Sequence, residues 1–145
     1  MGLVVFCNVR KEKVTYFCTQ CWKEIDRDEV MCPHCGANQH LLSREPFVRK
    51  LIRALRHPEA ETPVRAAYVL GELKAVDGVP DLIAAMTSTR DPYLAAACAR
   101  ALGEIGDFTA LRTLEELLRR QAPFIVRRAA ERSVEKLKEA QRGRA

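Results

Sequence analysis

Apolar side chains recur at helical spacing through the C-terminal two thirds of the chain. From Glu45 onward they return every three or four positions, which is the period of an amphipathic helix. The most apolar segment is 93–104. Its apolar residues fall on one stripe that is typical of a buried helix face, namely Leu94, Ala97, Ala101, Leu102 and, just beyond, Ile105. The pattern therefore predicts helices throughout this part of the chain.

Caps and prolines divide the region into six helices. The first is predicted over 46–56 and stops before His57-Pro58, because the residue before a proline disfavours helical angles. The second is predicted to begin at Thr62-Pro63, a polar N-cap followed by proline at the first helical position. The remaining four are predicted to begin at Asp77, Asp91-Pro92, Asp107 and Ala122-Pro123.

A motif recurs in these helices with a period of 32 residues. Leu70-Gly71-Glu72 matches Leu102-Gly103-Glu104, and a third copy has decayed to Val134-Glu135-Lys136-Leu137. A glycine inside a helix costs about 1 kcal/mol relative to alanine, so its repetition indicates helices whose backbones approach closely. A period of this length with two helices per unit is typical of an α-solenoid, in which three units are about the minimum for a stable stack.

Two stretches carry the repeat most fully, VRAAYVLGEL at 64–73 and ACARALGEIGD at 97–107. They resemble the HEAT-repeat family, in particular its short form first associated with phycobilisome lyases, and the resemblance covers about residues 46–140. It implies an all-α, right-handed solenoid of about three HEAT-like helix pairs, predicted here over 44–142, that binds other macromolecules. It implies no reaction, because a fold does not determine chemistry.

Four cysteines lie close together ahead of the helices, in CTQCWKEIDRDEVMCPHCGANQ at 18–39. Two residues between thiols let one tight turn present both sulfurs to one cation, and ten residues between the turns allow a hairpin that brings the pairs together. Four sulfurs at about 2.3 Å from the metal make a closed structural zinc site with no open position for catalysis. Structural Zn²⁺ is therefore predicted on Cys18, Cys21, Cys32 and Cys35.

The second cysteine turn, Cys32-Pro33-His34-Cys35-Gly36, suits a metal knuckle. Its proline fixes one backbone angle and its glycine allows a left-handed residue. With the first turn it resembles the zinc-ribbon family, which implies a small β module, predicted over 14–40. The first turn departs from the family pattern, because Trp22 stands where glycine is expected. Phe17 and Trp22 are expected to shield the site.

The join between the two parts, residues 37–44, is short and not rich in glycine or serine. The ribbon is therefore expected to pack against helix 46–56, through Phe47, Val48 or its own aromatic residues, and to cap the end of the solenoid.

Other chemistries stay open for the cysteines. A rubredoxin-like iron site uses similar turns at a longer separation, so iron is the minor alternative to zinc. Two redox pairs would each need a helix N-terminus in a βαβ setting, which the pattern does not predict. His34 and His40 are expected to be solvent-facing loop residues. Cys7 is left unpaired, and Cys98, among alanines, is expected in the core.

Composition and charge favour a folded protein without a transmembrane helix. The chain is 48% hydrophobic and 30% charged, so it can bury a core and does not have a disordered composition. It has no apolar run of about 18 residues, which predicts no transmembrane helix and favours a cytoplasmic protein. The net charge of +5 comes from residues 43–145. This positive charge is compatible with binding to nucleic acid but does not specifically indicate it. Residues 1–13 are expected to form an arm or a strand, and the sequence predicts no role for them.

Function is expected on the surface of the helical repeats. By helix phase, the helices starting near 63, 92 and 123 line a concave face, and its candidate partner-binding residues are Arg65, Tyr68, Glu72, Arg100, Glu104, Arg128 and Arg132. The favoured prediction is a scaffold or adaptor that binds another protein and is not an enzyme, since no nucleotide loop or catalytic-triad spacing is present. Two alternatives stay open, a nucleic-acid-binding protein that uses its basic face and an accessory subunit of a metabolic or redox enzyme complex.

Overall fold

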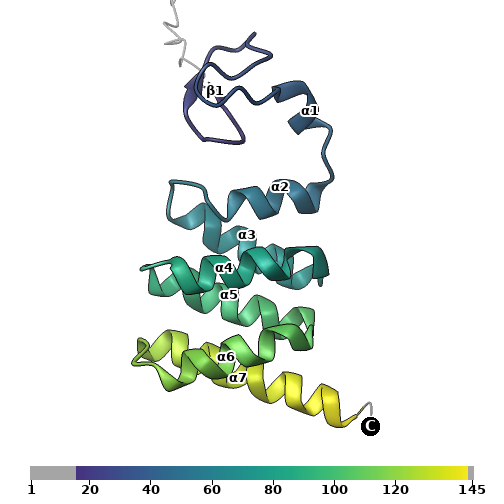
Figure 1. Cartoon of the computed structure of the whole chain (residues 1–145), viewed down its shortest axis with the longest axis vertical. Coiled ribbons are helices and arrows are strands. Elements are labelled where there is room, and N and C mark those ends of the chain that lie inside the picture. The colour runs from purple at the N-terminus through teal and green to yellow at the C-terminus, as the bar shows by residue number, and fades with distance from the viewer. Residues whose placement is uncertain (1–15, 144–145) are drawn as a thin grey trace, which may run out of the picture.

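The computed structural model describes residues 16–143, which form two short strands followed by a stack of helices (Figure 1). Strands β1 (Tyr16–Phe17) and β2 (Glu24–Ile25) pair antiparallel. A short helix, α1 (Gln39–Ser43), leads to the stack. The stack comprises α2 (Phe47–Ala54), α3 (Glu61–Glu72), α4 (Val79–Ser88), α5 (Pro92–Ile105), α6 (Leu111–Arg119) and α7 (Phe124–Arg142), with 3₁₀ turns η1 (Val76–Gly78) before α4 and η2 (Phe108–Ala110) before α6.

The helices pack as three successive pairs. Helix α2 packs on α3, α4 on α5 and α6 on α7, while α5 also packs on both α3 and α7. Figure 1 shows these pairs following one another along the long axis of the molecule, with the strands at one end. The predicted fold class, an all-α solenoid with a small N-terminal β module, is confirmed. No helix within residues 16–143 is both long enough and apolar enough to cross a membrane.

The 32-residue period also organises the core. Buried residues at equivalent positions form columns through the stack, namely Ala66, Cys98 and Ala130; Leu70, Leu102 and Val134; and Leu82 and Leu114. Cys98 is fully buried in the first column, as predicted, and burial raises the pKa of its thiol to about 12. A thiol that stays protonated in an apolar setting is unreactive, so Cys98 is a packing residue.

Gly71 and Gly103 lie where neighbouring helices approach most closely. A Cβ added at Gly71 would lie 2.9 Å from the Cα of Ala101, and one added at Gly103 would lie 2.9 Å from the Cα of Ser133. Carbon atoms in well-packed contact stay about 3.5–4.0 Å apart, so neither position has room for a methyl group. The close backbone packing predicted from the repeated glycine is confirmed.

The helix starts agree with the prediction to within four residues, and Asp77 and Asp107 lie at the 3₁₀ turns that precede α4 and α6. Asp91 caps α5, where its carboxylate accepts a backbone N–H at 2.9 Å. Asp107 also caps, but it caps the 3₁₀ turn η2 that precedes α6. Helix α3 begins at Glu61, one residue before the predicted cap Thr62, whose hydroxyl instead donates to the Glu59 carboxylate.

The strand module meets the stack through one of its own aromatic residues, but at His57, just after α2, and not along that helix or through Phe47. The rings of Trp22 and His57 meet edge to face, with centroids 4.3 Å apart. Across the join, the Lys50 side chain of α2 donates to the Ser43 carbonyl of α1 at 2.7 Å. Phe47 is 61% exposed and so makes little contact. The segment 1–13 and Cys7 lie outside the described residues.

Candidate metal centre and partner-binding groove

Two turns of the same backbone geometry present the four cysteines. In each turn, the N–H of the first cysteine donates to the carbonyl five residues on, and the N–H four residues on donates back to the cysteine carbonyl. These bonds are 2.9 and 2.8 Å long at Cys18, and both are 2.9 Å long at Cys32. The two cysteine pairs are thus held in matching knuckles that face each other.

Trp22 takes the left-handed position that glycine fills in the second knuckle. Its φ is 61°, against 71° for Gly36. A left-handed conformation costs a residue with a Cβ roughly 1–2 kcal/mol. The departure from the family pattern therefore does not loosen the first knuckle, which keeps the geometry and places the Trp22 ring against His57.

The four sulfur atoms lie close enough together to bind one metal ion. The Sγ atoms of Cys18, Cys21, Cys32 and Cys35 all lie within 4.8 Å of one another. The Cys18–Cys35 and Cys21–Cys32 sulfur pairs are both 3.7 Å apart. Four sulfurs placed tetrahedrally about 2.3 Å from a metal would be about 3.8 Å apart. The four cysteines therefore have the spacing and chemistry to hold one metal ion.

The surroundings spread the pKa values of these thiols apart. Burial raises the pKa of Cys18, but hydrogen bonds from two N–H groups of its own turn, from another cysteine and from the Gln39 amide outweigh burial and lower the pKa to about 6. For Cys35, a hydrogen bond from the Ala37 N–H lowers the pKa, but burial and the three neighbouring thiols outweigh it and raise the pKa to about 12. Cys18 is therefore the readier of the two to become a thiolate, the form that binds metal.

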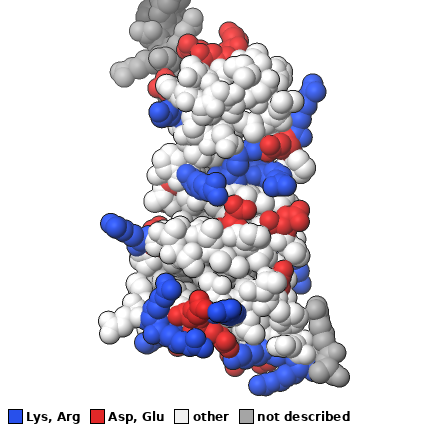
Figure 2. Space-filling view, viewed as in Figure 1, with Lys and Arg blue, Asp and Glu red and all other residues white. Residues whose placement is uncertain are grey.

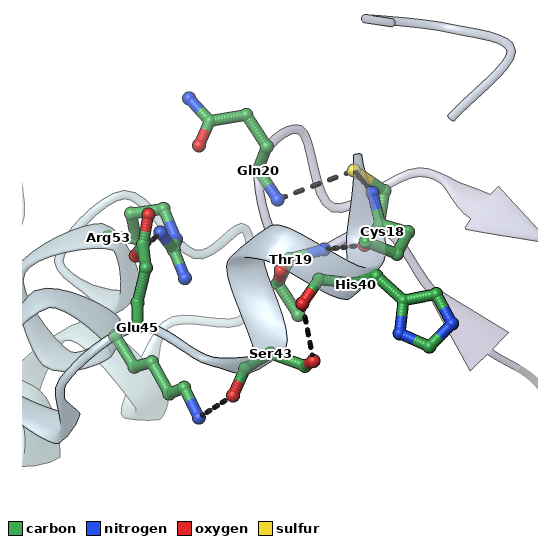
Figure 3. Close-up of polar contacts among 9 residues, drawn as sticks. Cys18, Thr19, Gln20, His40, Ser43, Glu45 and Arg53 are labelled. Carbon is green, nitrogen blue, oxygen red and sulfur yellow. Dashed lines mark hydrogen bonds and ion pairs between the residues drawn. The ribbon is translucent and has the colours of Figure 1, made fainter. Parts of the chain in front are cut away.

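Donors from two sides point at the Cys18 sulfur. The Gln20 N–H lies 3.4 Å from it, as Figure 3 shows, and the Gln39 side-chain nitrogen lies 3.2 Å from it. N–H groups aimed at sulfur stabilise its negative charge, as outer-shell donors do around metal ligands. His34 and His40 are exposed, as predicted, but His40 lies in helix α1 and not in a loop. The His40 ring extends away from the Cys18 sulfur in Figure 3.

The predicted aromatic shield is wrong for one of its two residues. Phe17 is 54% exposed, because β1 is a two-residue strand that packs, among the described elements, only beside β2. Trp22 is half-buried, but the contact it makes is with His57 of the helical part. The cysteine cluster is therefore held by backbone hydrogen bonds more than by apolar cover.

The seven candidate partner-binding residues are all exposed and lie on α3, α5 and α7. Six of them line two adjoining hollows. The smaller, about 100 Å³, includes Tyr68, Glu72, Arg100 and Glu104. The larger, about 700 Å³, which we call the α5–α7 groove, includes Arg100, Glu104, Arg128 and Arg132. Arg65 lines a separate shallow hollow at the start of α3 and α5. The structure thus brings the seven residues onto one face.

Four further exposed residues of the α5–α7 groove were not predicted, namely Tyr93, Phe124, Ile125 and Lys136. The repeat register contains a signal for two of them, because Ile125 lies 32 residues after Tyr93 and Lys136 lies 32 after Glu104. Tyr93, Phe124 and Ile125 are residue types that usually lie in a protein core, and only the fold shows that they are exposed.

The charges of the groove are unevenly paired. Glu104 and Lys136 form an ion pair across α5 and α7. Arg100, Arg128 and Arg132 form no ion pair with any described residue. On the face drawn in Figure 2, acidic and basic side chains are intermixed over the helices. The groove therefore presents three uncompensated guanidinium groups.

Comparison with known proteins identifies the family of this chain. A family model for HEAT repeats matches residues 48–135, which is more than half of the chain. The chain belongs to the HEAT-repeat family. The chain is similar to the bilin biosynthesis protein PecE of Mastigocladus laminosus, with 43% identity over 70 residues. That stretch covers 47% of this chain but only 26% of PecE, so the chain spans about a quarter of that relative. The predicted resemblance is confirmed.

A second similarity is of another kind. The chain is 39% identical over 46 residues to the DNA-directed RNA polymerase subunit Rpo12 of Sulfolobus acidocaldarius. The match covers 28% of this chain and 94% of Rpo12, so one stretch of this HEAT-repeat protein is related to nearly the whole of that subunit.

Proposed function

We propose that this HEAT-repeat protein is a zinc-binding scaffold that holds a protein partner and catalyses no reaction of its own. In this proposal residues 14–40 form a zinc ribbon, residues 44–142 form the binding domain, and Cys18, Cys21, Cys32 and Cys35 bind one structural Zn²⁺. Four cysteine ligands would fill the coordination sphere, which supports a structural role for the metal. Reduced cysteine pairs suit a reducing compartment, so we propose the cytoplasm.

The observation that carries the proposal is the convergence of the seven candidate residues on the face of α3, α5 and α7. Residues 32 apart in sequence become neighbours on this face, as with Tyr68, Arg100 and Arg132. Stacked repeats bind partners through such extended surfaces. We propose that Arg65, Tyr68, Glu72, Arg100, Glu104, Arg128 and Arg132 contact the partner.

The similarity to Rpo12 supports a second candidate, an accessory subunit of a multi-protein assembly. The aligned stretch, 46 residues, is nearly as long as the 47 residues that precede the HEAT match. We infer that it lies there and includes the cysteine cluster. In this version the ribbon holds one component of an assembly and the α3/α5/α7 face holds another. Direct binding of nucleic acid to the basic groove is the competing function.

Affinity capture from the native cells tests the scaffold proposal. The chain and its Arg100→Glu/Arg128→Glu variant are compared with an Arg49→Glu/Arg112→Glu control, which changes two exposed arginines outside the groove. A stoichiometric protein companion lost only from the groove variant is expected. If every companion bound both variants equally, the assignment of this face would be wrong. Nuclease treatment of the lysate separates protein companions from those tethered by nucleic acid.

A further inference from the structure

The α5–α7 groove has an apolar end. At the starts of its two helices, Tyr93 is 70% exposed, Phe124 is 66% exposed and Ile125 is 39% exposed. Large apolar side chains gathered on an exposed surface are typical of interaction sites, where aromatic residues are enriched. These three residues can bury an apolar anchor of a partner.

The floor of the groove is made of small residues that let a partner approach the two helices closely. They are Ala96, Ala97 and Gly103 of α5 and Ala129 and Ser133 of α7. The floor carries no charge, so a partner side chain can lie in it without leaving a buried charge unpaired.

The middle of the groove is cationic. Arg100, Arg128 and Arg132 line it without ion pairs among the described residues, whereas Glu104 and Lys136 neutralise each other at the far end. A guanidinium group binds a carboxylate through two parallel hydrogen bonds, which favours carboxylates as ligands here. From Tyr93 to Arg100 is seven helical residues, or about 10 Å at 1.5 Å per residue.

From this arrangement we infer that the α5–α7 groove binds an acidic protein segment with an apolar or aromatic anchor about 10 Å from its carboxylates. The inference rests on the proposed scaffold function and names the chemistry of its partner. In a helical segment the anchor and the acidic residues lie about seven residues apart, and in an extended segment about three.

The same face fits nucleic acid less well. Sites for single strands place aromatic residues along a basic track so that successive bases stack. Within the α5–α7 groove the aromatic residues are Tyr93 and Phe124, both at the starts of their helices. Successive bases lying along Arg100, Arg128 and Arg132 would therefore have no rings on which to stack.

Selection of peptides on the zinc-loaded full chain tests the inference. The probe is a displayed library of random peptides of roughly 12 residues, which span about 18 Å as helices. Peptides are selected on the wild type and on a groove variant, Arg100→Gln/Arg128→Gln/Arg132→Gln. The control, Arg49→Gln/Arg112→Gln/Arg142→Gln, loses the same three charges outside the groove. Enrichment of sequences that combine Asp or Glu with Phe, Trp or Leu is expected on the wild type and the control, and not on the groove variant.

Fluorescence anisotropy with one selected peptide then gives the size of the effect. The groove variant is expected to bind at least about tenfold more weakly, as the loss of three charge contacts predicts, and the control about as tightly as the wild type. Phe124→Ser should weaken the peptide and leave an oligothymidine probe unaffected. Selected peptides without acidic residues, equal losses in both triple variants, or tighter binding of oligothymidine than of any peptide would overturn the inference.

The same variants separate this inference from the proposed function. If the native companion is lost from the groove variant while the selected peptides are not acidic, the scaffold role holds and the inferred chemistry fails. If the companion stays bound to the groove variant, the binding face itself is wrong.

Discussion

Replacing Gly103 by alanine tests the packing on which the groove depends. The added Cβ would lie 2.5 Å from the Oγ, 2.7 Å from the Cβ and 2.9 Å from the Cα of Ser133. A hydroxyl could rotate away, but the Cα belongs to the backbone of α7. Helices α5 and α7 would therefore have to separate, which would also change the groove between them.

Two opposing effects determine how much the free energy of unfolding changes in Gly103→Ala. Alanine is favoured over glycine inside a helix by about 1 kcal/mol. Overpacking a well-packed contact costs about 1–3 kcal/mol, and a clash with backbone belongs at the upper end of that range. The free energy of unfolding is thus expected to fall by about 1–2 kcal/mol in Gly103→Ala. In Gly71→Ala, where the nearest atoms are 2.9 and 3.2 Å away, the fall should be smaller.

Urea unfolding followed by circular dichroism measures the effect on the zinc-loaded chain. Gly143→Ala is the matched control, because its Cβ would meet nothing closer than 3.7 Å, and it should change stability by less than about 0.5 kcal/mol. Adding Ser133→Gly removes the two shortest contacts, so the pair should show a coupling energy of at least about 0.5 kcal/mol. A Gly103→Ala variant as stable as the wild type would refute the close approach of α5 and α7.

Three further predictions concern the cysteine module. Cys32→Ser should abolish zinc binding, measured by atomic emission, and leave the helical circular dichroism of the repeats nearly unchanged, so loss of helix signal would show that the two parts fold as one. Trp22 is the only tryptophan and contacts His57, so His57→Ala should red-shift its emission with zinc retained, and an unchanged spectrum would place Trp22 elsewhere. Protons compete with metal for thiolates, and the pKa of Cys18 is lowered to about 6. Zinc affinity, measured against a chelator, should therefore fall as the solution is acidified, and more steeply below about pH 6, where Cys18 also binds a proton, whereas a pH-independent affinity would contradict thiolate ligation.

The repeat was predictable because its signals are local and recur. A buried column needs the same kind of residue every 32 positions, and a close helix contact needs glycine at the same place in each unit, as at Gly71 and Gly103. N-caps are equally local, which is why Asp91 was placed correctly. Asp77 was not, because it lies inside the 3₁₀ turn η1, and the sequence signals of a 3₁₀ turn and of a helix start are alike.

The geometry at Trp22 and the exposure of the groove aromatics were harder to predict. A tryptophan with positive φ is disfavoured by its own Cβ, so nothing in the residue type predicts that it completes a knuckle. The ring's contact with His57 joins positions 35 apart and depends on how the ribbon meets the stack. Tyr93 and Phe124 are residues of core type, and their exposure follows from where the stack leaves a face uncovered.

Native mass spectrometry of the chain purified from its own cells at low salt tests the central claim most directly, because it counts metal ions and companions on the same molecules. The scaffold account predicts one zinc per chain, lost in Cys32→Ser, and a protein companion that is absent when Arg100 and Arg128 are replaced. Iron in place of zinc would overturn the structural metal site and make electron transfer the leading function. A companion that binds the arginine variant as well as the wild type would contradict the binding face.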